Sequence, residues 1–316
     1  MAEKEYDIII AGGGPGGLCA GMYAARANRK TVCIERFLTG GQISLTGDVE
    51  DYPGFEHIQG PELGKKFTDH AVKFGLEIVR DEVVEIYAED DDRIVACASG
   101  NIYRGKAVIV STGGTPVKLG VKGEAEYSGK GVSYCAICDG AFFKNQVIAV
   151  VGGGDAAVEE GTFLTKYGSK IHLIHRRDKF RAQKIVQQRA FDNEKVEILW
   201  DTVVESIEGN SSKITHLNLN NSKTNEKSKL DVGAIFIYIG FHPNSNLFRD
   251  KVKLDENGYI LTNDRMETSI KGIYACGDVR AQLVRQVTNA VGDGTTAAVA
   301  AEKYIETLED KIAQRV

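Results

Sequence analysis

The sequence predicts an α/β protein in which one architecture occurs twice, each copy combining a parallel sheet with a small antiparallel meander. Two glycine-rich turns predict this fold, one starting at Gly12 and one at Gly152, each between a short apolar strand and a helix. A run of short alternating strands with turn residues follows each turn unit and closes on a further apolar strand. The repeat therefore predicts two similar domains that account for most of the chain.

The length and composition are those of a globular protein of about two domains. The chain has 316 residues, of which 26% are charged and 42% hydrophobic. The net charge of −5 argues against a general nucleic-acid binder, because such proteins carry a basic stripe. No apolar run approaches the roughly 20 residues of a membrane helix, and the N-terminal segment lacks the basic start of a secretory signal. We expect a cytoplasmic protein with no membrane or nucleic-acid partner.

The first turn unit has the order strand, turn, helix, strand, with strands expected at residues 8–11 and 31–34 and a helix at residues 15–28. Its turn reads Gly12-x-Gly14-x-x-Gly17, and these glycines allow a tight turn and a close approach of backbone amides to a pyrophosphate. The helix N-terminus adds free N–H groups and a positive dipole end. Glu35 follows the second strand, where an acid accepts hydrogen bonds from a ribose diol. This unit is predicted to bind a dinucleotide.

The second turn unit repeats this order. Strands are expected at residues 147–151 and 170–174, with a helix between them that ends near residue 166. The turn reads Gly152-x-Gly154-x-x-Ala157, so this unit is also predicted to bind a dinucleotide.

A basic cluster replaces the acid at the end of the second unit's second strand. It comprises His175, Arg176, Arg177 and Arg181. An acid at this point would repel a 2′-phosphate, whereas arginines bind one through charge-assisted, bidentate hydrogen bonds. The alternative is a solvated basic surface patch, which is what charge runs usually are. The position directly after the strand favours NADPH over NADH.

The C-terminal segment indicates which dinucleotide the first unit binds. Residues 268–279 are predicted to form a strand that ends at Gly277-Asp278, where an aspartate can bond a sugar-like hydroxyl chain. A helix is expected to begin near Gly294, with its N-terminus toward the electron-rich edge of a flavin. Alone, Gly277-Asp278 could be only a turn. Together with the two glycine motifs, it predicts FAD in the first unit.

In this combination the chain resembles the low-molecular-weight thioredoxin reductases of bacteria and archaea, over nearly its whole length from about Tyr6. The motifs occur in the order of that family: GGGPGG, GGQ at residues 40–42, CAICDG, GGGDAAVEE, HRRDKFRA, ACGDV and RQ at residues 285–286. The combination of CxxCDG with HRRxxFRA is specific, since related flavoenzymes generally lack one or the other.

The resemblance implies that an NADPH-binding domain is inserted in an FAD-binding domain. The FAD-binding domain would comprise residues 1–115 and 245–316, and the NADPH-binding domain, with the cysteine pair, residues 116–244. The linkers would lie near Pro116 and Pro243, and proline is consistent with a linker. The resemblance also implies a homodimer.

The matching motifs imply the contacts of both cofactors. FAD would contact Gly12, Gly14, Pro15, Gly17, Glu35, Arg36, Gly41, Gln42, Thr112, Gly113, Gly277, Asp278, Arg285, Gln286 and Val287. NADPH would contact Gly152, Gly154, Asp155, Ala156, Ala157, His175, Arg176, Arg177 and Arg181. Electrons would pass from NADPH through FAD to a disulfide of the enzyme, and on to the disulfide of thioredoxin.

The pair Cys135-x-x-Cys138 has three interpretations. A structural zinc site needs four ligands, and the sequence contains no second pair of this kind. A static disulfide across a two-residue gap would constrain little of the unfolded chain. In a reducing cytoplasm a disulfide of this spacing is more often catalytic. A redox-active dithiol is the interpretation that remains, and no metal is expected.

The resemblance assigns Cys138 to the flavin side and Cys135 to the attack on the partner's disulfide, both by thiol–disulfide exchange. Asp139 would protonate the departing thiolate, unless it only caps the turn that follows. A docking patch for thioredoxin could flank the pair, unless its phenylalanines belong to the core. Its residues would be Lys130, Phe142 and Phe143.

Some positions depart from the family pattern, among them Ser111, which changes little. Ile137 replaces the more usual threonine between the cysteines, and Ala141 stands where an aromatic residue is common. Cys276 stands beside the flavin aspartate and is either inert packing or an oxidation-sensitive thiol. The departures at Ile137 and Ala141 concern the preferred partner, not the reaction type. The alternatives are a reductase of another small redox protein (glutaredoxin-like or peroxidase-linked) and a non-catalytic flavin redox sensor.

Overall fold

The computed structural model describes residues 3–46, 48–248 and 251–314, which form two compact units. The first unit comprises Met1–Ser44, Val49–Thr115 and His242–Val316, and the second comprises Leu45–Asp48 and Pro116–Phe241. The chain leaves the second unit after Phe241. The outer limits of the expected domain ranges, residues 1–2 and 315–316, lie outside the described residues.

The sheet of the first unit has seven strands in the order β5-β2-β1-β8-β7-β6, and β19 also pairs with β8. Their bounds are β1 Glu3–Ala11, β2 Thr31–Glu35, β5 Glu77–Arg80, β6 Val83–Glu89, β7 Asp92–Cys97, β8 Ile102–Val110 and β19 Ile273–Ala275. Strands β5, β2, β1, β8 and β19 pair in parallel, whereas β8, β7 and β6 pair antiparallel. The meander is therefore continuous with the parallel sheet, because β8 belongs to both.

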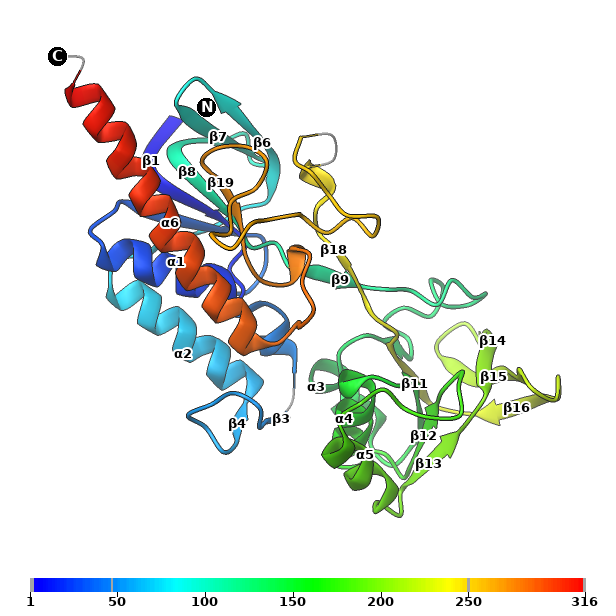
Figure 1. The fold of residues 1–316 in the computed structure, drawn as a ribbon. Coiled ribbons are helices and arrows are strands. Elements are labelled where there is room, and N and C mark those ends of the chain that lie inside the picture. The colour runs from blue at the N-terminus through cyan, green and yellow to red at the C-terminus, as the bar shows by residue number, and fades with distance from the viewer. Residues whose placement is uncertain (1–2, 47, 249–250, 315–316) are drawn as a thin grey trace. The chain divides into compact units, whose positions relative to one another are not determined.

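Three long helices belong to the first unit, and their bounds are α1 Pro15–Arg26, α2 Gly60–Lys73 and α6 Val287–Ala313. Figure 1 shows α1 and α6 side by side, with α2 next to α1. Ile8 and Ile10 of β1 share a core with these helices, whereas Ile9 belongs to a core that includes the meander. Residues 8–11 of β1 are buried on both faces, which agrees with the continuous apolar run at this end of the strand.

Helix α6 begins at Val287, so the expectation of a helix start near Gly294 is wrong. A Cβ atom on Gly294 would collide with the backbone carbonyl oxygen of Gly16 in α1. The glycine therefore permits the close approach of two helices and does not mark a helix end.

The second unit contains a parallel sheet in the order β10-β17-β11-β12-β13 and a separate antiparallel sheet in the order β14-β15-β16. The strands of the parallel sheet are β10 Val132–Ser133, β11 Val147–Gly152, β12 Lys170–Ile174, β13 Val196–Leu199 and β17 Ala234–Tyr238. The meander strands are β14 Thr202–Gly209, β15 Ile214–Asn221 and β16 Lys227–Asp231. The helices are α3 Ala136–Asp139, α4 Asp155–Leu164 and α5 Lys184–Phe191.

The two faces of the second unit's parallel sheet have different coverings. Ile148 and Val150 of β11 belong to a core with Val158 of α4, whereas Ala149 belongs to a core with Leu217 of the meander. This alternation follows from the two-residue period of a strand. As in the first unit, the glycine turn thus lies at the carboxyl end of a central strand, where open α/β sheets bind ligands.

The remaining elements are short. Strands β9 and β18 pair with each other at the two points where the chain passes between the units, and β3 pairs with β4. Their bounds are β3 Asp48–Val49, β4 Ile58–Gln59, β9 Gly114–Pro116 and β18 Phe241–Pro243. Single 3₁₀ turns lie at Gly41–Leu45, Gly140–Phe143, Asn246–Phe248 and Gly277–Val279.

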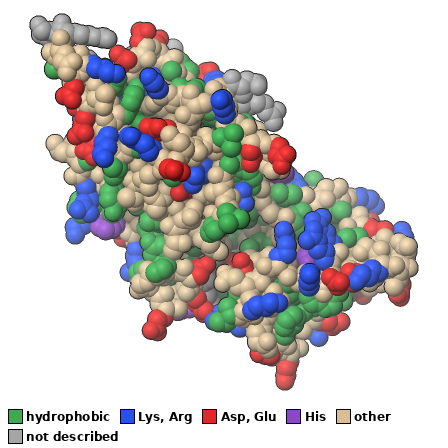
Figure 2. All heavy atoms as spheres, in the orientation of Figure 1, with side chains coloured by type: hydrophobic (Ala, Val, Ile, Leu, Met, Phe, Trp, Pro, Cys, Tyr) green, Lys and Arg blue, Asp and Glu red, His purple; other side chains and the backbone are tan. Residues whose placement is uncertain are grey.

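The surface carries charges of both signs. On the face drawn in Figure 2, Lys and Arg side chains lie among Asp and Glu side chains. None of the described helices is both long enough and apolar enough to cross a lipid bilayer.

Candidate active site: two dinucleotide cradles and a dithiol turn

The first cradle is the turn between β1 and α1. Gly12 has φ +105°, and a Cβ atom there would collide with the carbonyl oxygen of Ser111. A Cβ on Gly17 would collide with the carbonyl oxygen of Gly12. By contrast, a Cβ on Gly14 would meet nothing within 4 Å, and Gly14 caps α1 without a side-chain hydrogen bond, with Pro15 following it. Gly12 and Gly17 therefore make the close backbone contacts of the turn, and the space at Gly14 stays open. This open face lies at the amino end of α1, which suits a phosphate group.

Glu35 connects this cradle to the end of β2. Its carboxylate accepts hydrogen bonds from the backbone N–H of Gly13 at 2.7 Å and of Phe37 at 2.9 Å. Each carboxylate oxygen keeps acceptor capacity for a hydroxyl group. The neighbouring Arg36 is exposed and lies 3.4 Å from Glu82. The structure therefore brings the predicted acid to the glycine turn.

Two further predicted segments flank the first cradle. Gly41 has φ +58°, and a Cβ on it would lie 3.0 Å from the Cα of Gly14, so the turn containing Gln42 packs against the glycine motif. At the end of β8, Thr112 Oγ1 donates to the carbonyl oxygen of Asn244, and Asn244 Nδ2 donates back to Thr112 O, both at 2.8 Å. Gly113, which follows, has φ +61° and open space at its Cβ position.

Asp278 lies in the turn after β19 and is half-buried. In the part of the chain that the structure describes, its carboxylate receives no hydrogen bond from the protein. Burial raises its pKa, while Arg285 lowers it and Asp293 raises it further. The Arg285 guanidinium lies over the ring of Tyr259 at 4.2 Å, and Gln286 and Val287 follow at the start of α6. A half-buried carboxylate without a donor fits a ligand that supplies hydroxyl groups.

The second cradle is the turn between β11 and α4. Gly152 has φ +153°, and a Cβ on it would collide with the carbonyl oxygen of Tyr238 and press on Ala157. Gly154 is open at its Cβ position and caps α4 without a side-chain hydrogen bond. Asp155 accepts a hydrogen bond from the backbone N–H of Gln183 at 2.7 Å. Ala156 is exposed and Ala157 buried, so the second cradle has the same open outer face as the first.

The structure divides the basic cluster into an exposed and a buried part. Arg176, Arg177 and Arg181 are exposed, and among the described residues no carboxylate pairs with their guanidinium groups. Arg181 is joined to the cradle, because its backbone N–H donates to the carbonyl oxygen of Gly153 at 2.7 Å. Three arginines without acidic partners beside a dinucleotide cradle fit a phosphate group.

His175 instead lies beneath the cradle. A Cβ on Gly153 would collide with its imidazole ring, and one ring nitrogen lies 3.1 Å from the carbonyl oxygen of Lys179. Burial lowers the pKa of His175, and the charges of Arg181 and Arg177 also lower it, although hydrogen bonds with the backbone of Lys179 and Gly152 raise it. His175 therefore supports the backbone of the cradle and is not available to contact a 2′-phosphate in this conformation.

The cysteine pair forms a disulfide at a single helical turn, α3. Cys135 Sγ accepts a hydrogen bond from the backbone N–H of Cys138 at 3.2 Å. Asp139 does not cap the following 3₁₀ turn with its side chain. Its carboxylate instead accepts a hydrogen bond from Ser133 Oγ at 2.6 Å, and the same Ser133 Oγ accepts one from the backbone N–H of Cys135 at 3.1 Å. Ser133 therefore links the carboxylate of Asp139 to the backbone of Cys135 by two hydrogen bonds.

Like Ser133, Tyr238 is a residue of this site that the sequence did not predict. Its hydroxyl accepts a hydrogen bond from the backbone N–H of Ala136 at 2.8 Å, and burial raises its pKa. The partners are 102 positions apart in the chain, so no local pattern predicts the contact. Ser133 did have a local signal, since it precedes Cys135 by two residues, a spacing at which serine often bonds the backbone.

The predicted docking residues differ in environment. The side chain of Phe142 is 76% exposed, and Lys130 is also exposed. Phe143 is only partly exposed and packs edge-on against the buried Phe236, with 6.1 Å between ring centroids. Of the two phenylalanines, Phe142 is the more exposed.

The other four cysteines are buried thiols, Cys19, Cys33, Cys97 and Cys276. Burial raises the pKa of each, to about 12 for Cys97 and Cys276. Since the thiolate is the reactive form, alkylation of the reduced native protein is expected to label Cys135 and Cys138 only. Mass spectrometry of the intact protein checks this, with the denatured protein as the control in which all six cysteines react. Rapid labelling of Cys276 in the native protein would show an accessible thiol beside Asp278.

With this geometry established, the chain can be compared with known proteins. The model of the family described as pyridine nucleotide-disulphide oxidoreductases matches residues 6–294. The chain therefore belongs to this family.

Closer relatives define the group within the family. The chain is 48% identical over 310 residues to a thioredoxin reductase of Bacillus subtilis, covering 98% of each chain. It superimposes with a TM-score of 0.93 on a thioredoxin reductase of Lactococcus lactis, which is 45% identical, over 96% of this chain and 99% of that one. The corresponding enzyme of T. acidophilum gives a TM-score of 0.92 at 33% identity, with 96% and 99% coverage. Within the family, the chain is a member of the low-molecular-weight thioredoxin reductases.

Proposed function

We propose that this enzyme uses NADPH to reduce the disulfide of a thioredoxin, through FAD and the Cys135–Cys138 disulfide. The balanced reaction is NADPH + H⁺ + thioredoxin disulfide → NADP⁺ + thioredoxin dithiol. The observation that carries the proposal is the Cys135–Cys138 disulfide, formed in a chain that also contains two dinucleotide cradles. The similarity to thioredoxin reductases along 98% of the chain supports it.

The residues of the first unit fit FAD, and those of the second unit fit NADPH. The open face at Gly14 suits the pyrophosphate of FAD, and the donor-free carboxylate of Asp278 suits hydroxyl groups of its sugar-like chain. The open face at Gly154 suits the second pyrophosphate, with Arg176, Arg177 and Arg181 beside it for a 2′-phosphate. When bound, the two cofactors would supply the hydride transfer, whereas the two cysteines pass electrons on by thiol–disulfide exchange.

The exchange with thioredoxin is carried out by the two cysteines. The thiolate of Cys135 attacks one sulfur of the thioredoxin disulfide, which forms a mixed disulfide and releases the other thioredoxin sulfur as a thiolate. Cys138 then attacks the Cys135 sulfur, which restores the Cys135–Cys138 disulfide and releases the second thioredoxin thiolate. Both released thiolates take up protons. When two electrons reopen the enzyme disulfide, Asp139, oriented by Ser133, supplies a proton to the departing sulfur.

Replacing Asp139 by asparagine is expected to slow reduction of the enzyme disulfide about a hundredfold, because general acid catalysis typically contributes a factor of that order. Ser133→Ala is expected to slow it by roughly threefold to tenfold, the effect of one orienting hydrogen bond, and Ser133→Thr should restore the rate. Rapid-quench thiol counting after mixing with NADPH measures the rate. The exposed Ser128, replaced by alanine, is a matched control. A normal rate in Asp139→Asn would remove this residue from the mechanism.

A coupled assay with purified carriers tests the function itself. NADPH oxidation is expected to be fast with oxidised thioredoxin, with kcat/KM about a hundredfold lower for a glutaredoxin-like or a peroxidase-linked carrier. A higher value with either of these carriers would identify a different physiological partner. No turnover with any carrier, in a protein that binds both cofactors, would favour a redox sensor.

The proposal includes a homodimer acting in the reducing cytoplasm, where a disulfide of this spacing is more often catalytic than structural. Light scattering during size-exclusion chromatography is expected to give twice the chain mass of 34.4 kDa. A mass equal to that of one chain would reject the dimer without affecting the proposed reaction.

A further inference from the structure

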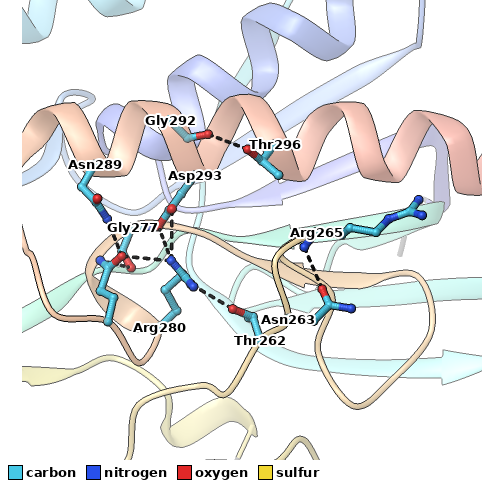
Figure 3. Close-up of polar contacts among 10 residues, drawn as sticks. Thr262, Asn263, Arg265, Gly277, Arg280, Asn289, Gly292, Asp293 and Thr296 are labelled. Atoms are coloured by element: carbon cyan, nitrogen blue, oxygen red, sulfur yellow. Dashed lines mark hydrogen bonds and ion pairs between the residues drawn. The ribbon is translucent and has the colours of Figure 1, made fainter.

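We infer that Arg280 and Asp293 position the Gly277–Asp278 turn for FAD, a role that rests on the proposed function of the first unit. Figure 3 shows the network they form with Thr262, Gly277 and Asn289. We call the pair Arg280 and Asp293, with the Gln282 amide that bridges them to Gly277, the turn clamp.

The centre of the turn clamp is a buried ion pair. Arg280 Nη1 lies 3.1 Å from both carboxylate oxygens of Asp293, and their side chains are 15% and 9% exposed. Asp293 Oδ2 also accepts a hydrogen bond from the backbone N–H of Gly277 at 3.1 Å. One carboxylate on α6 thus holds both the arginine and the turn.

A second set of contacts holds the other side of the turn. Gln282 Nε2 donates to the carbonyl oxygen of Gly277 at 3.0 Å, and Arg280 Nη1 donates to Gln282 Oε1 at 3.1 Å. Asn289 donates to the same Gln282 oxygen, and Arg280 Nε donates to Thr262 Oγ1 at 2.9 Å. Side chains therefore bond both backbone polar groups of Gly277, the residue before Asp278. Gly277 has φ +70°, a conformation that favours glycine.

The turn clamp also connects Asp278 to the first cradle. Asp293 precedes Gly294, whose close contact with the backbone of Gly16 fixes this part of α6 against α1. The glycine turn before α1 and the Asp278 turn are consequently held relative to the same two helices. A site held in its binding conformation loses less conformational freedom on binding, so a fixed turn binds FAD more tightly than a mobile one.

Replacing Arg280 by methionine is expected to raise the FAD dissociation constant of the enzyme about tenfold, equivalent to about 1.4 kcal/mol. The measurement is the FAD retained by the holoenzyme at serial dilutions, followed by flavin fluorescence. Arg280→Lys keeps the charge and should give a smaller rise of about threefold. Arg265→Met is the matched control, because Arg265 lies on the same connection but pairs with Glu267 at the surface, with side chains 58% and 39% exposed.

A double variant separates positioning from general stability. Arg280→Met with Asp293→Leu removes both charges, so it leaves no unpaired buried charge and is expected to fold. If the turn clamp positions the turn, FAD affinity should stay about tenfold weaker in this variant. If the ion pair only stabilises the fold, FAD affinity should return to the wild-type value. A cooperative thermal unfolding transition checks that the first unit of each variant is folded, and unchanged NADPH binding checks the second unit. Normal FAD affinity in the folded double variant would overturn the inference, whereas a wild-type protein without FAD would overturn the proposed function instead.

Discussion

Replacing Cys138 by serine is expected to abolish thioredoxin reduction, lowering kcat at least about a thousandfold. A serine hydroxyl cannot form the disulfide through which electrons leave the enzyme. Each catalytic cycle ends with the Cys135–Cys138 disulfide restored, so neither sulfur can complete the cycle without the other. The turnover of NADPH with oxidised thioredoxin measures this loss. Cys135→Ser is expected to have an equal effect, because the two residues work as a unit.

The Cys138→Ser variant is expected to keep the first half-reaction, in which NADPH reduces FAD. NADPH is expected to bleach the flavin absorbance of Cys138→Ser at the wild-type rate, since neither cradle includes the cysteine pair. Cys97→Ala is the matched control, a buried cysteine on β7 outside the site, and should keep thioredoxin turnover. Thioredoxin reduction at more than a few per cent of the normal rate in Cys138→Ser would mean that electrons bypass the disulfide.

Replacing Arg176, Arg177 and Arg181 together by alanine is expected to lower kcat/KM for NADPH about a hundredfold. Hydrogen bonds to charged groups typically contribute 1.5–3 kcal/mol each, and solvent screening at this exposed site reduces that value, so two effective bonds account for the loss. The three guanidinium groups have no carboxylate partner among the described residues, so their removal breaks no ion pair of the fold. The ratio of kcat/KM for NADPH to that for NADH measures the effect.

The comparison with NADH makes this test specific. The value for NADH should change less than about threefold, since NADH has no 2′-phosphate for the arginines to bind. Arg189→Ala, an exposed arginine on α5 of the same unit, is the control and should leave both values unchanged. An equal loss with both nucleotides would indicate damage to the cradle, and no loss with NADPH would reject the basic cluster as the 2′-phosphate site.

Local patterns predicted the two cradles well, because each depends on residues close together in the sequence. The strand at residues 170–174 has the predicted bounds, and the strand at residues 31–34 extends by one residue to Glu35. The first helix ends at Arg26 rather than Asn28, whose φ of +61° stops the helix. Glycine conformations, apolar runs and helix starts are all determined within a few residues, which is why they could be read directly.

Contacts between distant segments could not be read in this way. Glycine is common at helix ends, yet Gly294 lies inside α6, where the backbone of Gly16 leaves no room for a Cβ atom. His175 belongs to a charged run, yet its ring is buried under Gly153. The hydrogen bond from Ala136 to Tyr238 joins segments that only the completed sheet brings together. In each case tertiary packing decides the role of a residue, and single-sequence patterns carry no information about it.

The most direct test of the account is to count thiols at Cys135 and Cys138 during one turnover. The holoenzyme is reduced with one equivalent of NADPH without oxygen, mixed with oxidised thioredoxin, quenched and alkylated for mass spectrometry. The account predicts that NADPH converts this pair, and no other cysteine, to free thiols, and that thioredoxin returns it to the disulfide as its own two thiols appear. Thioredoxin thiols that form while the Cys135–Cys138 disulfide stays intact would contradict it.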